Sequence, residues 1–202
     1  MKVITFDNEE DWLNSRVGKI TGTKVPDVLT FRGTAKKKGF WALIAERVEV
    51  KEEGYENAME RGKRLEEEAV IKFCAETGKK VDTTLQLWIS DEDSSIALSP
   101  DGAIGKTEAL EVKCLNSASH IEALITKEVP ADYHYQVLQY FIVNSDLKKL
   151  YFAFFDPRIP AKEFFYLTIN RKDIAEEIEK IKAEEIAQLK EIERITLELT
   201  GY

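Results

Sequence analysis

The stretch that decides the fold is SPDGAIGKTEALEVKCL, residues 99–115. Its second half is rich in apolar residues and β-formers around Glu111, Val112 and Lys113, which is typical of a β-strand. Residues two positions apart on a strand point to the same face, so Glu111 and Lys113 share a side while Val112 turns into the core. Asp101 lies at the turn that enters the preceding strand and can meet them there.

Two carboxylates and an amine gathered in this way indicate a magnesium site. Mg²⁺ keeps several waters and usually takes one or two protein carboxylates, here Asp101 and Glu111. The ion lowers the pKa of a bound water and neutralises charge on a phosphate, while Lys113 orients or polarises the water. A surface salt bridge between Glu111 and Lys113 is the alternative, and such spacings arise by chance. The apolar setting of ALEVKCL favours a site, because two charges are costly there unless a site uses them.

The composition predicts a single domain spanning residues 1–202. Of these residues 44% are hydrophobic and 33% charged, which suffices for one sizeable core. No apolar run approaches the roughly 18 residues that span a bilayer, and the acidic start differs from a signal peptide, so we expect a cytoplasmic protein. Cys74 and Cys114 lie far apart without CxxC spacing and suggest neither a disulfide framework nor a zinc or iron–sulfur site.

The periodicity of the chain predicts an α/β fold with a mixed central β-sheet flanked by helices. Helices are expected near Asp7, after Thr21, and over residues 39–50, 58–77, 131–144 and 171–199. Strands are expected in three runs of an antiparallel meander between Val81 and Val112, in LYFAFFD and in FFYLTIN. An apolar stripe on the last helix predicts packing on the core, with a subunit interface as the alternative. The stripe consists of Ile174, Ile178, Ile181, Ile186 and Leu189.

The net charge of −8 does not by itself favour binding of a nucleic acid, whose phosphates attract Lys and Arg. From Asp173 to Tyr202 nine acids face four bases, so this tail carries −5 and the preceding residues only −3. Two basic clusters upstream are candidates for phosphate contacts, although ordinary solvated surface charges explain each cluster equally well. They are Arg32 with Lys36, Lys37 and Lys38, and Arg61 with Lys63 and Arg64.

Six stretches between about Trp12 and Arg158 carry a family resemblance. They read SRVGKITGTKV, RGKRLEEEA, ALSPDGAI, ALEVKC, DYHYQVLQYF and YFAFFDPRI. In this order they resemble the motifs of the phage lambda exonuclease group, the YqaJ-like viral recombinase family within the PD-(D/E)xK nuclease superfamily. The resemblance implies a restriction-endonuclease-like core, whereas the acidic tail matches only as a helix.

The resemblance also assigns roles at the expected metal site. It places Asp101, Glu111 and the backbone carbonyl of Val112 as metal ligands, and Lys113 as the catalytic lysine. Glu66 falls on a carboxylate that supports the metal site, although a solvated helical glutamate is the simpler interpretation of this residue alone.

Gln136 matches a glutamine that positions the attacking water or the scissile phosphate. Gln139 lies nearly one turn further along the same helix and faces a similar direction, so either amide fits this role. A surface amide is the alternative for both. We assign no role to His134 or His120.

Arg16, Thr23 and Ser99 match a pocket for a terminal 5′-phosphate, in which a guanidinium and hydroxyl groups bind the phosphate monoester. The family commonly has serine at the position of Thr23, which keeps the hydroxyl and adds a methyl group. Met59 matches an apolar residue that wedges the duplex apart, and core packing explains it equally well.

The resemblance therefore implies a magnesium-dependent 5′-to-3′ exonuclease, in which Mn²⁺ substitutes for Mg²⁺. Such an enzyme degrades one strand of linear double-stranded DNA to mononucleotides and leaves a 3′ single strand for recombination. It further implies a homotrimer that encircles DNA, a single-strand annealing protein as partner, and a gene of a bacterium, phage or prophage.

Two other kinds of function stay open. One is a different nuclease of the superfamily, either an endonuclease or a CRISPR-associated nuclease, whose iron–sulfur cluster needs more thiolates than two cysteines supply. The other is a DNA-binding recombination module without catalysis, which would lack one of Asp101, Glu111 and Lys113.

Overall fold

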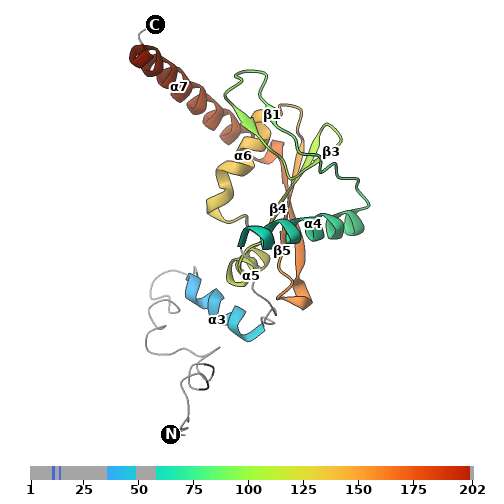
Figure 1. Cartoon of the computed structure of the whole chain (residues 1–202). Coiled ribbons are helices and arrows are strands. Elements are labelled where there is room, and N and C mark those ends of the chain that lie inside the picture. Colours follow the sequence, from blue (N-terminus) through green and yellow to red (C-terminus); the bar gives the residue numbers. More distant parts are fainter. Residues whose placement is uncertain (1–10, 12–13, 15–35, 49–57, 201–202) are drawn as a thin grey trace. The chain divides into compact units, whose positions relative to one another are not determined.

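The computed structural model describes residues 11, 14, 36–48 and 58–200 (Figure 1). Within these ranges the chain forms two compact units. The first contains the described residues up to Leu65, Cys114–Glu128 and Phe154–Phe165, and the second contains Glu66–Lys113, Val129–Ala153 and the chain from Tyr166 onward. The helix expected after Thr21 lies outside the described residues, and so does the helix expected near Asp7 apart from Asp11 and Asn14, which are helical. The prediction of a single domain stays a prediction.

A four-stranded sheet has the strand order β3-β4-β5-β6. The strands are β3 (Gly102–Ile104), β4 (Glu108–Lys113), β5 (Lys149–Phe155) and β6 (Phe164–Asn170). β3 and β4 are antiparallel, with Gly102 opposite Leu110. The backbone N–H groups of Lys148 and Lys149 both donate to the carbonyl of Thr107, at 2.7 and 3.3 Å, so β4 and β5 begin side by side. This start-to-start arrangement is that of parallel neighbours joined by a long crossover.

The last two strands are antiparallel neighbours. The N–H of Asp156 donates to the carbonyl of Glu163 at 2.8 Å, and the N–H of Arg171 donates to the carbonyl of Lys148 at 3.0 Å. The sheet therefore contains both kinds of pairing, and the predicted α/β class with a mixed sheet is confirmed.

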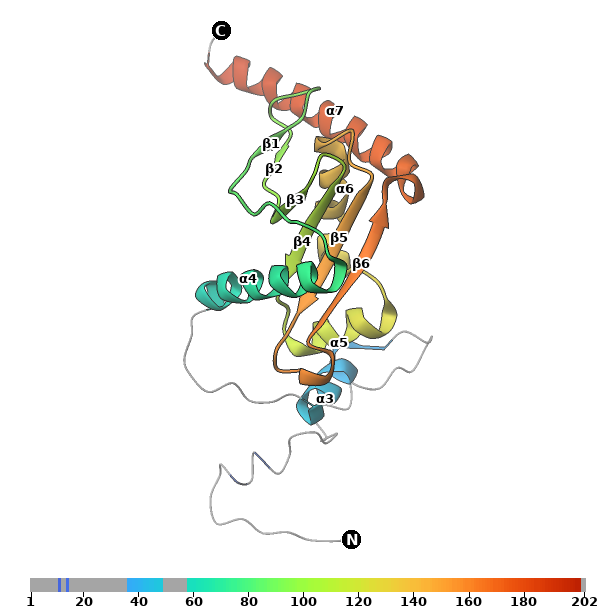
Figure 2. The same cartoon turned by 90° about the vertical axis from the view of Figure 1, so that its right-hand side faces the viewer.

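Helices cover both faces of the sheet in the second unit. The helix α4 (Ala58–Thr77) crosses one face, and α6 (His134–Val143) lies behind the other (Figure 2). Phe73 of α4 is fully buried and packs edge-on against Tyr166, with ring centroids 5.3 Å apart, and also contacts Tyr151. A 3₁₀ turn, η2 (Ala131–Tyr133), precedes α6 and brings Tyr133 against Phe152.

The C-terminal helix α7 (Ala175–Thr200) begins later than predicted, because residues 171–173 form the 3₁₀ turn η4 (Arg171–Asp173). The Arg171 guanidinium donates to the carbonyls of Leu147 and Asn144, both at 2.8 Å, and to that of Phe141. These bonds satisfy carbonyls at and beyond the end of α6 and fix the start of the last segment. Of the predicted stripe, Ile178 is buried. Whether the whole stripe packs on the core or forms a subunit interface stays a prediction.

The predicted meander was partly wrong. Its first run forms only the short strand β1 (Trp88–Ile89), which pairs antiparallel with β2 (Ala97–Leu98) in a separate sheet. Upstream of β1 the chain makes a single bridge, from Asp82 to Ala103. The Asp82 carboxylate accepts the backbone N–H of Thr84 at 3.0 Å, and such a local bond competes with a strand ladder.

In the first unit, α3 (Lys38–Val48) packs against α5 (Ser117–Thr126). Trp41 and Ala45 of α3 meet Ile121 of α5 and Ile159 in a small buried cluster. α5 was not predicted, although Asn116 caps it: its side chain accepts the N–H of Ser119 at 2.9 Å. Among the described helices, none is long and apolar enough to cross a membrane.

Candidate active site

Strand β4 places Glu111 and Lys113 on one face, as the sequence predicts. Glu111 is 1% exposed, and the Lys113 ammonium nitrogen lies 2.5 Å from its Oε1 atom. Val112 between them is buried among the apolar residues of the second unit. Lys113 also lies over the ring of Tyr133, 5.0 Å from its centroid, which favours a cation at this position.

Asp101 approaches β4 from the turn that enters β3. Its Oδ2 atom accepts the backbone N–H of Val112 at 2.8 Å, which places the carboxylate beside Glu111. The turn depends on Gly102, because a Cβ atom there would lie 2.3 Å from the Cγ1 atom of Val81. The glycine after Asp101 thus lets two segments approach closely and aims the acid at the strand.

Two side chains of α6 complete the surroundings of Glu111. The amide nitrogen of Gln136 donates to Oε1 at 2.5 Å, and the hydroxyl of Tyr140 donates to Oε2. The N–H of Asp101 in turn donates to the Tyr140 hydroxyl at 3.4 Å. These two residues are four apart, one helical turn, which puts them on the same face of α6.

The sequence offered Gln136 and Gln139 as alternatives, and Gln136 is the one that reaches Glu111. Gln139 is half-buried and makes no hydrogen bond to that carboxylate. Tyr140 was missed by the sequence analysis. Its signal was its position one turn after Gln136, on a helix expected to face the sheet.

The surroundings of Glu111, Asp101 and Glu66 disfavour the charged forms of these carboxyl groups. Burial, followed by the neighbouring Asp101, raises the pKa of Glu111 to about 7. Burial also raises the pKa of Asp101, and burial and Asp101 together raise that of Glu66. Burial alone would lower the pKa of Lys113, but the Glu111 carboxylate outweighs it and raises it. Clustered, desolvated carboxylates of this kind favour the arrival of a positive charge.

The donor set fits a divalent metal in kind. Carboxylate oxygens are the ligands that Mg²⁺ takes, and the repulsion between Asp101 and each of Glu111 and Glu66 is what such an ion relieves. Within the part of the chain that the structure describes, no three His, Cys, Asp or Glu side chains are already grouped to hold a metal. The Lys113 ammonium and the Gln136 amide now contact the Oε1 atom of Glu111.

The remaining predicted site residues fall in different places. Ser99 is exposed in the turn before Asp101. Met59 lies in the first turn of α4, and its side chain is outside the described set. Arg16 and Thr23 also lie outside the described residues, so the expected 5′-phosphate pocket stays a prediction.

The sequence assigns no role to His134 or His120, and each contacts a group outside the acid cluster. His134 pairs with Glu177 of α7 at 2.8 Å. His120 is fully buried, and its Nε2 atom lies 2.8 Å from the carbonyl of Lys162 in the first unit.

The sequence matches a model of the YqaJ-like viral recombinase domain over residues 11–146. The chain belongs to this family. Two solved structures resemble it over 95% of its length and 98% of theirs, each with a TM-score of 0.61. One is an alkaline exonuclease, LHK-Exo, from Laribacter hongkongensis, 30% identical; the other is LHK-Exo in complex with dAMP, 29% identical. Curated proteins gave no match. The predicted family is confirmed, and the likeness supports a nuclease of the lambda exonuclease group.

Proposed function

We propose that this protein is a magnesium-dependent exonuclease that digests one strand of linear double-stranded DNA from its 5′ end. The observation that carries the proposal is that two carboxylates and an amine lie together. The Asp101 carboxylate accepts the backbone N–H of Val112, the residue between Glu111 and Lys113, and the Lys113 ammonium contacts the Glu111 carboxylate. The likeness to an alkaline exonuclease along nearly the whole chain supports the same conclusion.

Each residue has a distinct task in the proposed reaction. Asp101 and Glu111, with the carbonyl of Val112 and with Glu66 in support, hold the metal. The bound metal supplies a water of lowered pKa and neutralises charge on the scissile phosphate. Lys113 orients the attacking water. Gln136 holds the Glu111 carboxylate through a hydrogen bond to Oε1, the oxygen that Lys113 also contacts.

The product is a series of 5′-mononucleotides and a duplex with a 3′ single-stranded tail. Such a tail suits homologous recombination, and the recombinase family supports this role. We extend the proposal to a homotrimer that encircles DNA and delivers the tail to a single-strand annealing protein. Arg16, Thr23 and Ser99 recognise the terminal 5′-phosphate, and Met59 parts the strands. Mn²⁺ replaces Mg²⁺ in this scheme.

Cleavage of matched DNA substrates tests the proposal. The full-length protein is incubated with a linear duplex carrying a 5′-phosphate, the same duplex with a 5′-hydroxyl, and a closed circle, each with Mg²⁺ or a chelator. We expect mononucleotides from the linear duplexes only, faster with the 5′-phosphate and none with the chelator. Equal loss of the closed circle would point to an endonuclease and contradict the proposal.

A pair of variants tests the metal assignment. Asp101→Asn should lower the cleavage rate by about a thousandfold, since a metal supplies several kcal/mol to phosphate-ester cleavage. Asp82→Asn is the matched control: Asp82 is an exposed carboxylate of the same unit and lies outside the acid cluster. Unchanged cleavage by the Asp101 variant would remove the assignment.

A further inference from the structure

The ammonium group of Lys113 has two neighbours of different kinds in the second unit. One is the Glu111 carboxylate, whose Oε1 atom lies 2.5 Å from the nitrogen. The other is the aromatic ring of Tyr133, over which the nitrogen lies 5.0 Å from the centroid. The face of an aromatic ring carries partial negative charge and attracts a cation at this distance. The proposed reaction gives Glu111 and Lys113 a role, but none to Tyr133.

The ring of Tyr133 is fixed by parts of the fold outside β4. Its backbone belongs to the 3₁₀ turn η2, in which the Tyr133 N–H donates to the carbonyl of Pro130 at 2.9 Å. The ring packs against Phe152 of β5, with centroids 6.0 Å apart, and Phe152 is fully buried. The ring therefore offers the ammonium a surface whose position does not depend on the Glu111 carboxylate.

Tyr133 contacts the site through its ring and not through its hydroxyl group. Within the part of the chain that the structure describes, the Tyr133 hydroxyl makes no hydrogen bond. The hydroxyl of Tyr140, in contrast, donates to the Glu111 carboxylate. The two tyrosines thus contact the Glu111 and Lys113 pair in different ways, and removal of the hydroxyl oxygen alone separates them.

The Glu111 carboxylate alone does not hold Lys113 throughout the proposed reaction. Gln136 donates to the same Oε1 atom at 2.5 Å, so two groups share it. A carboxylate that also binds a metal attracts the ammonium less, because the metal offsets its negative charge. The Lys113 side chain is 22% exposed and has several rotatable bonds, so a weakened ion pair allows it to turn toward solvent. The uncharged ring binds no metal and keeps its attraction.

We propose that Tyr133 is a positioning residue for Lys113, whose ammonium the ring face keeps beside Glu111 while that carboxylate binds a metal. The inference rests on the proposed function, in which Lys113 orients the attacking water. Tyr133 acts through Lys113, so it affects the rate of cleavage and not the affinity for DNA.

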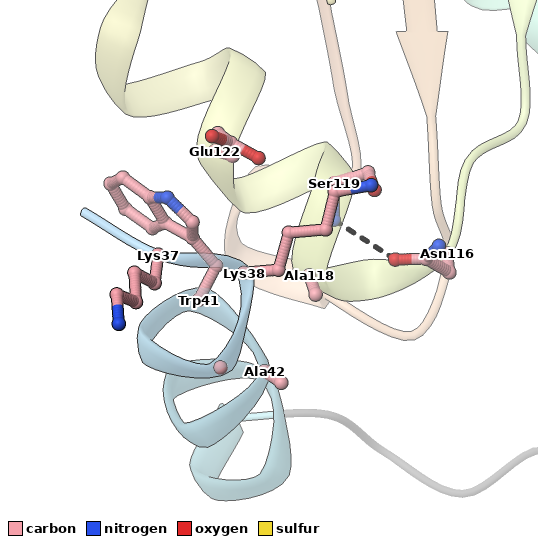
Figure 3. A pocket seen from close by; sticks show the side chains of 9 residues that line it. Lys37, Lys38, Trp41, Ala42, Asn116, Ala118, Ser119 and Glu122 are labelled. Carbon is pink, nitrogen blue, oxygen red and sulfur yellow. Dashed lines mark hydrogen bonds between the residues drawn. The ribbon is translucent and has the colours of Figure 1, made fainter. Parts of the chain in front are cut away.

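Other lysines of the chain show what the contact means elsewhere. Lys79 has the same two kinds of neighbour, the Glu108 carboxylate at 2.7 Å and the Tyr151 ring at 5.2 Å. Glu108 and Glu111 are three positions apart on β4 and point to opposite faces. Lys38, which lines a pocket of about 460 Å³ between α3 and α5 in the first unit (Figure 3), has neither kind of neighbour among the described residues. The Lys79 contact is therefore a matched control without the proposed metal site.

Replacement of the ring tests the proposal through kcat and KM for a linear duplex, measured with the full-length protein at saturating Mg²⁺. Tyr133→Leu should lower kcat about five- to thirtyfold and change KM less than about twofold, because the attraction of the ring is lost. Tyr133→Phe keeps the ring face, and its kcat should stay within about twofold of the original value. Equal losses in the two variants would assign the role to the hydroxyl group and overturn the proposal.

Rings of nearly the same shape separate attraction from packing. Phenylalanine carrying one, two or three fluorine atoms is incorporated in place of Tyr133, because each fluorine withdraws electron density from the ring face and weakens its attraction for a cation. The value of kcat should fall with each added fluorine. The same series in place of Tyr151, under Lys79, should leave kcat within about twofold. No fall at Tyr133, or equal falls at both positions, would overturn the proposal.

NMR locates the ammonium without any cleavage. In protein with isotopically labelled lysine, the Tyr133 ring should shift the ε-methylene protons of Lys113 upfield, and Lys113→Arg identifies their signal. The shift should vanish in Tyr133→Leu and persist when Mg²⁺ is added without DNA. Loss of the shift on adding Mg²⁺ would overturn the proposal.

The two kinds of measurement also separate this inference from the proposed function. A protein that keeps the upfield shift with Mg²⁺ and cuts no DNA would contradict the proposed function and still support Tyr133 as the group that holds Lys113. A protein that cuts linear DNA at the same rate throughout the fluorine series would contradict this inference alone.

Discussion

At the scale of single residues, three neighbouring side chains hold the carboxylate of Glu111. Lys113 and Gln136 contact one of its oxygens, and Tyr140 donates to the other. Both oxygens are thereby fixed in direction while the carboxylate is almost fully buried. Such support from neighbouring side chains is what sets the orientation of a ligand before a metal binds.

Tyr140→Phe should therefore impair catalysis without unfolding the protein. The change removes one hydrogen bond to a buried carboxylate, worth about 1.5–3 kcal/mol, or roughly ten- to a hundredfold in rate. The rate limb that depends on Glu111 should also move to higher pH, because the lost donor had lowered its pKa. Steady-state kinetics over a pH series measure both effects. Tyr135→Phe, at an exposed tyrosine of the same helix, is the control, and equal behaviour of the two variants would contradict the assigned role.

Stability without metal should fall as the pH rises. The pKa of Glu111 is raised from 4.5 to about 7, so in this window the folded protein retains a proton that the unfolded chain releases. The stabilising contribution is complete below the lower value and is lost as the pH rises through the upper one. Urea unfolding at a series of pH values in a chelator measures it, and Mg²⁺ should restore stability at neutral pH. Asp101→Asn should make the pH dependence weaker without abolishing it, because burial of Glu111 is the larger cause of its raised pKa. A metal-free stability that rises across this window would contradict the cluster.

The shared face of Glu111 and Lys113 could be predicted from the sequence because a strand has a period of two, and that rule needs no knowledge of the rest of the fold. The Tyr140 contact could not be predicted in this way. It joins α6 to β4, and no local rule states which helix will face which strand. The position of Asp101 could be predicted only in part. Its turn was evident from the sequence, but its hydrogen bond to Val112 depends on the close approach at Gly102.

At the scale of elements, long periodic segments were predicted well. The helix α4 has the predicted bounds, and β6 covers the whole of FFYLTIN. The helix α5 was missed because its ten residues begin shortly after β4, where the sequence was interpreted only as the end of ALEVKCL. Asn116 was the available signal, as an N-cap residue before a short apolar run.

The close approach of Gly102 to Val81 positions Asp101, and substitutions at these two residues test this. Gly102→Ala should destabilise the fold by about 1–3 kcal/mol and reduce cleavage, because the new methyl group meets the Val81 side chain. Val81→Ala in the same chain should restore much of both. Thermal unfolding and cleavage of the single and double variants provide the measurement. Gly62→Ala is the control for a glycine in open space, and a lack of rescue in the double variant would contradict steric contact as the cause.

At the scale of the whole molecule, the net charge of −8 must be reconciled with a polyanionic substrate. The acidic tail accounts for more than half of it, and the described part of the tail forms α7. Local basic groups can still bind phosphates, because screening limits the reach of distant acids to about 10 Å at moderate salt. Sequence alone indicated this uneven distribution, but not which lysines face a pocket.

The assembly state is a prediction at this scale. We expect three copies of the chain in solution, held together by burial of apolar surface, as proposed for an enzyme that encloses its substrate. Light scattering coupled to size-exclusion chromatography should give three times the chain mass of 23.1 kDa, with or without DNA. A mass of one chain throughout the micromolar range would contradict the homotrimer.

The alternation along β4 also limits which changes in the gene are tolerable. Deleting one codon between Glu108 and Lys113 would shift every later side chain to the opposite face and turn an acid or an amine into the apolar interior. An added codon at the Gly105 turn would leave this alternation intact, and the turn has open space around it. Natural length variation in related genes should therefore collect at the tip of this hairpin and avoid its second arm.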